Sequence, residues 1–227
     1  MLVRPRIIAA AGAVLAVLAC AAPASARIVE VGGTPEATPT CPSTPCFAVS
    51  RTTGYQAKVL DSRTTYIVPA DGRIVAWTIG LGNPDNRQIS FFDSSFGESS
   101  AGLTILRRGK RLYHRVMGQS PIENLQPYFG QRVQFPLAAS IRVKKGYVVA
   151  LTVPTWAPAL TQVLNDGSSW RASRAKGKCD KTQTQTAQTR MEQRTQYRCL
   201  YRARLTYSAT LITNPKPNKK PKTPAKR

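Results

Sequence analysis

Apolar and polar residues alternate over long stretches of this chain, and this alternation limits the folds that it can adopt. From Tyr197 to Leu211 every second residue is apolar, aromatic or cysteine, and most residues between them are Arg, Thr or Ser. Residues Arg73–Leu81 also alternate, with Trp77 in their more apolar set. Because successive side chains of a β-strand point to opposite faces, this period of two predicts strands with one face in a core.

Segments with the composition of strands continue through residues 51–213, separated by turns rich in Gly, Pro, Asn and Asp. The further predicted strands are Thr64–Val68, Gln88–Phe92, Leu103–Arg107, Leu112–Met117, Arg132–Phe135, Ser140–Val143, Tyr147–Val153 and Leu160–Leu164. No long segment combines helical periodicity with capping residues. We therefore predict an all-β domain over residues 51–213, folded as a single antiparallel β-sandwich.

The first 26 residues have the pattern of a secretory signal peptide. Arg4 and Arg6 precede an apolar run over Ile7–Cys20, and small residues at Ala24-Ser25-Ala26 end the segment. The apolar run is shorter than the roughly 20 residues that span a bilayer. No later segment is as apolar, so we expect a secreted protein without an integral membrane span.

Cys20 leaves a second outcome open. Val17-Leu18-Ala19-Cys20 partly resembles the lipobox of bacterial lipoproteins, in which the cysteine is lipidated and becomes the mature N-terminus. Cleavage before Cys20 would anchor the protein by lipid, whereas cleavage after Ala26 would release it. The lipobox normally has a smaller residue than Leu18 at that position, which favours release.

Four cysteines follow this segment, namely Cys41, Cys46, Cys179 and Cys199. An even number of cysteines in an exported chain indicates disulfides. We expect the two local pairings, Cys41–Cys46 and Cys179–Cys199. The alternative is a zinc site of four cysteines, which the lack of a Cys-x-x-Cys pair disfavours.

The flanking and polar segments have compositions that do not favour a core. Residues 27–50 are predicted to be a linker that contains the first disulfide, because Gly, Pro and Thr dominate residues 27–40. Residues 181–196 are almost wholly polar and are predicted to be an exposed loop held by the second disulfide. Residues 214–227 contain four Pro and six basic residues, which predicts a disordered tail.

The chain is strongly basic, with 33 Lys and Arg against 11 Asp and Glu. Arg4 and Arg6 lie in the signal peptide, so 31 basic residues remain against all 11 acidic ones, a net charge of +20. Such a charge favours polyanionic partners: an envelope polymer, an acidic glycan, a membrane surface or nonspecifically bound nucleic acid. The alternative is a charge that serves solubility alone.

Few residues indicate catalysis or metal binding. His114 is the one histidine, and the chain has no Gly-x-Ser-x-Gly nucleophile motif, no glycine-rich phosphate loop and no dinucleotide fingerprint. We predict no catalytic residue, no cofactor and no metal ligand. A calcium ion held by backbone carbonyls and one or two aspartates stays open.

Candidate binding residues are aromatic or basic. Trp156 and Trp170 have the Pro and Ser neighbours of loops, where an indole can present a flat face to a sugar ring. Tyr128-Phe129, between Pro127 and Gly130, form another such candidate. The alternative is that these rings cover the ends of the core.

The basic candidates come from two places. Arg107-Arg108-Gly109-Lys110-Arg111 has the pattern of a basic hairpin tip, and the polar face of the last strand is expected to be solvated and basic. The basic candidates are Arg107, Arg108, Lys110, Arg111, Arg198, Arg202 and Arg204. The alternative is an ordinary solvated turn and strand face.

Two segments resemble parts of the jelly-roll domains of secreted bacterial proteins. Residues Tyr66–Trp77 are similar to their opening strand, and Ile141–Leu151 to their apolar strand, glycine turn and second apolar strand. The resemblance implies a β-sandwich of jelly-roll type. It includes no catalytic motif and transfers no site.

Together these features favour a secreted, non-enzymatic binding protein that associates electrostatically with anionic cell-envelope polymers or glycans. One alternative is a hydrolase that acts on polysaccharide or cell wall, with an acid pair assembled from distant loops. Another is a structural or assembly protein.

Overall fold

The computed structural model describes residues 25–33, 37–162, 167–181 and 184–215. The apolar run of the predicted signal peptide, Cys20 and most of the predicted tail lie outside the described residues. None of the helices in the described ranges is both long enough and apolar enough to cross a membrane.

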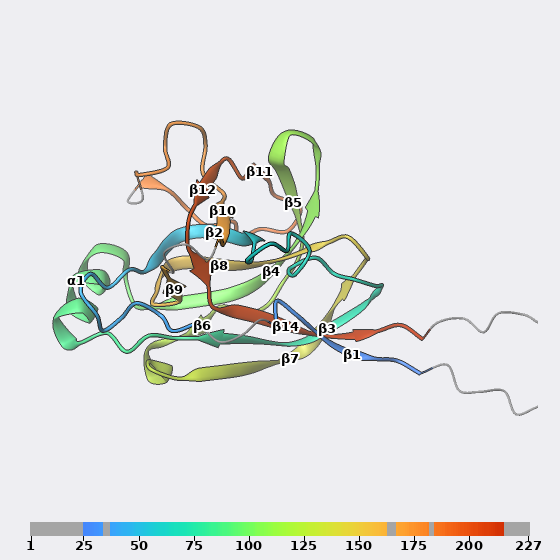
Figure 1. The fold of residues 1–227 in the computed structure, drawn as a ribbon, viewed down its shortest axis with the longest axis horizontal. Helices are drawn as coiled ribbons and strands as arrows, with labels where there is room; N and C mark the ends of the chain where they lie inside the picture. Colours follow the sequence, from blue (N-terminus) through green and yellow to red (C-terminus); the bar gives the residue numbers. More distant parts are fainter. Residues whose placement is uncertain (1–24, 34–36, 163–166, 182–183, 216–227) are drawn as a thin grey trace, which may run out of the picture.

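Two antiparallel sheets packed against each other form the body of the protein (Figure 1). The first sheet has the order β1-β14-β3-β7 and contains β1 (Ile28–Val31), β14 (Tyr207–Thr213), β3 (Gly72–Gly80) and β7 (Arg132–Val143). The second sheet has the order β11-β5-β4-β8-β2-β10-β12 and contains β11 (Arg194–Gln196), β5 (Tyr113–Gln119), β4 (Ser100–Arg108), β8 (Val148–Ala157), β2 (Val49–Lys58), β10 (Ser169–Ala172) and β12 (Cys199–Tyr201). The smaller elements are β6 (Glu123–Asn124), β9 (Leu160–Thr161), β13 (Arg204–Leu205), the helix α1 (Asn86–Phe96) and the 3-10 turns η1 (Lys110–Leu112) and η2 (Gln126–Tyr128).

The connectivity of the principal strands is that of a jelly roll. In chain order these strands are β1, β2, β3, β4, β5, β7, β8 and β14. The first sheet joins the first, eighth, third and sixth of them, and the second sheet joins the fifth, fourth, seventh and second. Two nested Greek keys produce this order. The predicted antiparallel β-sandwich of jelly-roll type is therefore confirmed.

The core between the sheets contains the alternating residues that the sequence indicated, among them the buried side chains of Trp77, Leu151 and Leu211. Strand β8 is buried on both faces. Val149 and Val153 belong to the core, whereas a second apolar cluster on the other face contains Tyr55, Leu106, Val116, Val148, Ala150 and Tyr197. Burial on both faces explains why the sequence of β8 is an apolar run with little alternation.

The predicted strand Gln88–Phe92 is wrong, because these residues lie in helix α1. The Asp85 carboxylate accepts from the backbone N–H of Gln88 at 2.9 Å, and the Gln88 side-chain oxygen accepts from the backbone N–H of Asp85 at 2.9 Å. This reciprocal capping box starts the helix. A short apolar run does not distinguish helix from strand, and α1 is the one α-helix among the described residues of this β-sandwich.

The linker predicted over residues 27–50 contains the first strand and the start of the second. Strand β1 pairs with β14, and Val31 is buried in the core. Four residues are too few for a recognisable period. Strand β2 begins at Val49 and was missed because its sequence is largely polar, whereas Thr64–Val68 contributes only an isolated bridge from Ile67 to Val148.

The last predicted strand is three strands, β12, β13 and β14. Its apolar set is buried as predicted, but Arg204, Thr206 and Ser208 of the other set are buried as well. Tyr197, Leu205 and Leu211 are all buried. The predicted strand Leu160–Leu164 is β9 over its first two residues, and residues 163–166 lie outside the described part of the chain.

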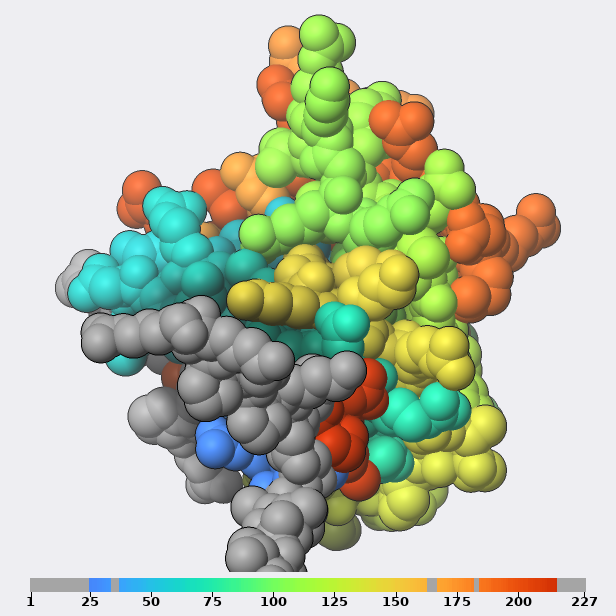
Figure 2. Space-filling model, turned by 90° about the vertical axis from the view of Figure 1, so that its right-hand side faces the viewer, coloured from blue at the N-terminus to red at the C-terminus, as the bar shows by residue number. Residues whose placement is uncertain are grey.

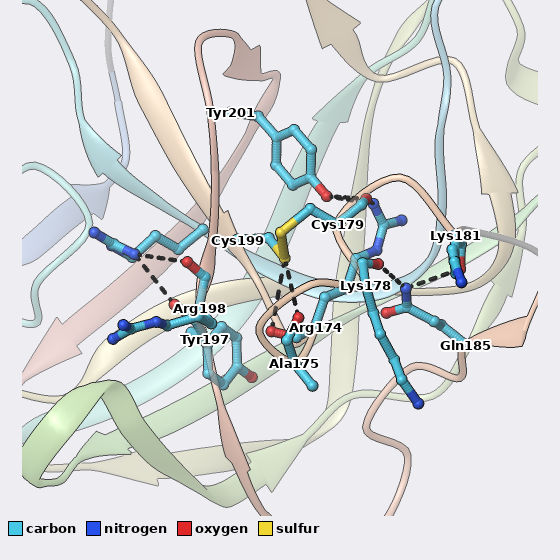
Figure 3. Close-up of a disulfide and its surroundings, with 11 residues drawn as sticks. Arg174, Ala175, Lys178, Cys179, Lys181, Gln185, Tyr197, Arg198, Cys199 and Tyr201 are labelled. Atoms are coloured by element: carbon cyan, nitrogen blue, oxygen red, sulfur yellow. Dashed lines mark hydrogen bonds between the residues drawn. A yellow bond between two sulfur atoms is a disulfide. The ribbon is translucent and has the colours of Figure 1, made fainter.

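Both predicted disulfides are present, Cys41–Cys46 and Cys179–Cys199. The surroundings of Cys179 are shown in Figure 3. The Tyr201 hydroxyl donates to the Cys179 carbonyl at 2.5 Å, and the buried guanidinium of Arg174 donates to the same carbonyl at 3.1 Å and to the Ser50 carbonyl at 2.9 Å. The second disulfide is thereby tied to strand β2 of the second sheet.

The polar segment 181–196 is largely exposed, as its composition predicted, but it is attached to the second sheet at Ala187 and Gln188. Its described part lies on the outer face of the second sheet, where Gln188 is only 1% exposed. The Gln188 backbone N–H donates to the Thr53 hydroxyl at 2.9 Å, its carbonyl accepts from the Gln119 side chain at 2.7 Å, and its side-chain oxygen accepts from the Tyr197 hydroxyl. Polar side chains of the sheet satisfy the polar groups of Gln188, so this residue is buried although it is not apolar.

Candidate functional site

Neither predicted tryptophan platform is exposed. Trp156 belongs to β8, stacks on Phe92 with the ring centroids 4.7 Å apart, and donates from its indole nitrogen to Asp93 at 2.8 Å. Trp170 belongs to β10, is 4% exposed and stacks on Tyr201 at 4.7 Å. Both indoles are therefore part of the packing, and their predicted placement in exposed loops is wrong because strands run through the Pro- and Ser-containing segments.

The third aromatic candidate is also packed. Tyr128 meets Phe135 edge to face at 5.4 Å, and Phe129 lies 5.5 Å from Trp156. Both rings pack against the core cluster, which agrees with the alternative that these aromatic residues cover the core.

The hairpin of β4 and β5 projects beyond the sandwich and carries the predicted basic tip (Figure 1). In the space-filling view it stands out at the top, flanked by orange residues from the part of the chain that carries β10, β11 and β12 (Figure 2). Leu103 and Ile105 of β4 are in the core, and the next residue on that face is Arg107, which is exposed. The strand thus leaves the core after Ile105. The exposed basic residues of the tip are Arg107, Arg108, Lys110 and Arg111.

Strand register aligns three arginines at the base of this tip. Arg107 of β4 lies opposite Arg115 of β5, and Arg115 lies opposite Arg194 of β11. Directly opposed residues of antiparallel strands share a face, with Cβ atoms about 5 Å apart, and like charges in such positions destabilise a sheet. We call Arg107, Arg115 and Arg194 the arginine row.

Two contacts hold the arginine row. Arg115 donates to the Glu192 carboxylate at 2.8 Å, and the Arg194 guanidinium lies over the Tyr113 ring, 4.7 Å from its centroid. Glu192 is the one carboxylate that pairs with the row among the residues that the structure describes. The row therefore keeps an excess of positive charge.

Opposed arginines also occur once on the first sheet, where Arg73 faces Arg142. There Arg73 donates to the Ser140 hydroxyl at 2.6 Å and to the Ser140 carbonyl at 3.2 Å. An opposed pair alone is therefore not distinctive. The distinctive feature is the alignment of three arginines at the base of a projecting hairpin.

Further cations lie on the opposite face of the hairpin base. Arg171 of β10 donates to the carbonyls of Tyr197 at 3.3 Å and Arg198 at 3.2 Å. The Gln196 side chain donates to the Arg111 carbonyl at 2.9 Å, which connects this segment to the tip. The structure thus brings Arg198 to the predicted basic tip and adds Arg115, Arg171 and Arg194, which the sequence did not single out.

Arg202 and Arg204 do not join this surface. Arg202 is exposed between β12 and β13, and no contact among the described residues connects it to the hairpin. Arg204 is 8% exposed, so its predicted place on a solvated face is wrong. It lines a cavity of about 220 Å³ with Tyr66 and Arg132. Burial raises the pKa of the Tyr66 phenol, and the charges of Arg204 and Arg132 act in the opposite direction.

No cluster of three His, Cys, Asp or Glu side chains able to hold a metal ion occurs within the described ranges. The described linings of the cavity at Arg204 and of a second one at Arg51 contain no carboxylate.

No family model matches this chain, and comparison with curated proteins and with solved structures finds no match either. The function is therefore argued from the geometry of the surface itself.

Proposed function

We propose that this protein is a secreted, non-enzymatic binding protein that attaches to anionic cell-envelope polymers or acidic glycans through one surface. The basic end surface comprises the arginine row together with Arg108, Lys110, Arg111, Arg171 and Arg198. The arginine row is the observation that carries the proposal, because directly opposed like charges destabilise a sheet and a bound anion would offset this cost.

The composition of the surface favours oxyanions. Seven of its eight residues are arginine, and a guanidinium can donate two parallel hydrogen bonds to a phosphate, sulfate or carboxylate group. A lysine ammonium acts more as a point charge. The surface is thus suited to polymers that repeat such groups.

The shape of the surface favours a polymer over a small anion. Its cations lie on both faces of a projecting hairpin, and most of them are exposed. A single small ion contacts few of them, whereas a long anion contacts many at once and gains from their number.

The contacts of the described acids support binding over hydrolysis. Asp93 accepts from Trp156 and from Gln126, Asp85 caps helix α1, and Asp71 accepts from the Lys145 backbone N–H at 2.8 Å. These carboxylates have structural partners. A glycoside hydrolase needs two carboxyl groups that face one cleft.

The exposed apolar residues give less support to an assembly role. Among the described residues, Ile28 and Ile212 lie opposite each other on β1 and β14. The other large exposed apolar side chains lie on separate elements: Leu60, Phe91, Ile122, Met191 and Leu200. The two disulfides are consistent with an extracellular location.

The experiment measures binding of residues 27–227 to three immobilised polymers: a phosphodiester, a sulfated and a carboxylate polymer. The variant R107Q/R115Q/R194Q removes the arginine row. The matched control R63Q/R87Q/R202Q removes the same charge from exposed positions elsewhere. We expect the row variant to bind at least about tenfold more weakly and the control to bind nearly as wild type. Equal losses in both variants would show that only net charge matters.

A further inference from the structure

The one histidine of the chain is buried beneath the basic end surface. His114 is 3% exposed, and its ring lies between those of Tyr55 and Tyr197, with the centroids 4.9 Å away in each case. Nδ1 lies 3.0 Å from the Leu112 carbonyl, which can only accept, so Nδ1 carries the proton. Nε2 is then the unprotonated nitrogen, and it is buried without a hydrogen-bond partner among the described residues.

The groups around this ring do not suit a charged imidazole. Tyr55 comes from β2 and Tyr197 from the segment after β11, while Arg108 of β4 and Thr195 of β11 lie directly opposite His114 on the neighbouring strands. Arg171 of β10 adds a second positive charge nearby.

No carboxylate offsets these charges in the described surroundings of the ring. Glu192 pairs with Arg115, which neighbours His114 on β5 and therefore points to the opposite face. The pKa of His114 is lowered to about 4, chiefly by burial; the hydrogen bond to Leu112 acts in the opposite direction, and the charges of Arg108 and Arg171 add to the lowering.

The ring also belongs to the contact that attaches β11 and its neighbours to the second sheet. The Leu112 carbonyl accepts from His114 and, at 2.9 Å, from the Tyr197 backbone N–H. The Tyr197 hydroxyl in turn donates to buried Gln188. A change at His114 therefore acts on the same contacts that fix Arg194 and Arg198 beside the hairpin.

We propose that His114 is an acid-sensitive latch, whose protonation releases residues 184–198 from the second sheet and withdraws Arg194 and Arg198 from the basic end surface. This regulation rests on the function proposed for that surface. Once residues 184–198 are released, the His114 imidazole is exposed to water and regains an ordinary pKa near 6.5. Between that value and about 4 the released state binds more protons, so falling pH favours release by up to about 300-fold.

The latch predicts that affinity for a polyanion falls in acid, which is the opposite of what net charge alone predicts. Acid neutralises carboxylates and so ordinarily strengthens the binding of a basic protein to a polyanion. Here acid removes cations from the binding surface. Binding should weaken as the pH falls through the window in which His114 becomes protonated.

The test uses residues 27–227 and dextran sulfate, whose charge is constant over this pH range, at fixed ionic strength. We expect the affinity of the wild type to fall at least about tenfold from pH 7.5 to pH 4.5. The variants H114F and H114Q should each keep, at pH 4.5, nearly the affinity that the same variant has at pH 7.5. Two variants are used because either may pack poorly, and thermal unfolding at pH 7.5 checks this.

Hydrogen exchange of residues 184–198, measured without polymer, tests the release itself. Faster exchange at pH 4.5 in the wild type but not in the His114 variants supports the latch. Unchanged exchange overturns it, as does release without loss of affinity, or an equal acid effect in all three proteins. If R107Q/R115Q/R194Q binds as wild type at pH 7.5, the proposed function fails, and the exchange measurement still decides whether the latch exists.

Discussion

The outer faces of the two sheets carry similar polar side chains in different surroundings. On the first sheet, Thr210 donates to Glu30 at 2.9 Å and accepts from Gln134 at 3.3 Å near the solvent. On the second sheet, the hydroxyls of Thr53 and Thr152 lie 2.8 Å apart and are fully buried beneath the segment that contains Gln188. The same residue type is therefore a solvated face in one place and part of a sealed interface in the other.

The two faces differ because residues 184–198 lie over the outer face of the second sheet. We call this segment the cover. The disulfide Cys179–Cys199, Gln188 and Tyr197 hold that cover, and the cover delivers Arg194 and Arg198 to the hairpin. The proposed binding surface therefore depends on the tertiary attachment of a polar segment. Changes to the cover should alter both stability and binding, whereas changes to the open face should alter neither by much.

The largest effect is expected from removing the disulfide that holds the cover. C179S/C199S removes a disulfide between cysteines 20 residues apart. This should lower the free energy of unfolding by about 3 kcal/mol on the chain-entropy model. Polymer affinity should also fall, because the arginines of the cover lose their position. Urea unfolding and polymer binding measure the two effects. C41S/C46S is the control, since its 5-residue separation predicts a smaller loss of stability and no loss of affinity.

Acid should act on the covered face through His114. Its pKa is lower in the folded than in the unfolded chain, so stability is retained above pH 6.5 and lost as the pH falls toward 4. The shift corresponds to about 3 kcal/mol at the lower end. Urea unfolding from pH 7 to pH 4 should show this loss in the wild type and much less of it in H114Q. The same slope in both proteins would assign the acid sensitivity to other groups.

Matched threonine substitutions compare the two faces directly. T53V removes the hydroxyl that accepts from the Gln188 N–H and contacts Thr152, which leaves buried polar groups unpaired and should lower the free energy of unfolding by about 2 kcal/mol. T210V lies on the open face and should cost about 0.5 kcal/mol or less. Similar values from urea unfolding would mean that the second sheet is not sealed.

The smallest effect is expected at the acid beside the arginine row. E192Q removes the carboxylate that pairs with Arg115, and both side chains are substantially exposed. Affinity for sulfated polymer should rise about twofold to threefold, with little change in stability because exposed ion pairs contribute little. Isothermal titration measures the gain, and weaker binding would contradict the proposed place of the row in the surface.

The sequence predicted the parts of the structure that depend on local pattern. Alternation identified β3 and the buried face of the last strands, and cysteine spacing identified both disulfides. Pro and Ser near Trp156 and Trp170 suggested loops, but strands run through both positions. The Asp85–Gln88 capping signal was present in the sequence and could have identified helix α1.

The basic end surface could be predicted only in part, because its geometry depends on register. The tip is visible as a run of basic residues, but the alignment of Arg107 with Arg115 and Arg194 comes from pairing between strands distant in sequence. Arg204 shows the converse. The strand is interrupted between β12 and β13. Alternation therefore predicted a solvated face for Arg204, whereas its side chain lines a cavity.

The salt dependence of polymer binding shows whether the arginine row contacts the polymer. Affinity for dextran sulfate is measured from 50 to 500 mM salt for the wild type, for R107Q/R115Q/R194Q and for the control R63Q/R87Q/R202Q. Each cation–anion contact adds about one to the slope of log affinity against log salt. The row variant should lose about two to three from this slope, and the control should keep the slope of the wild type. Equal slopes for the row variant and the control would contradict the account.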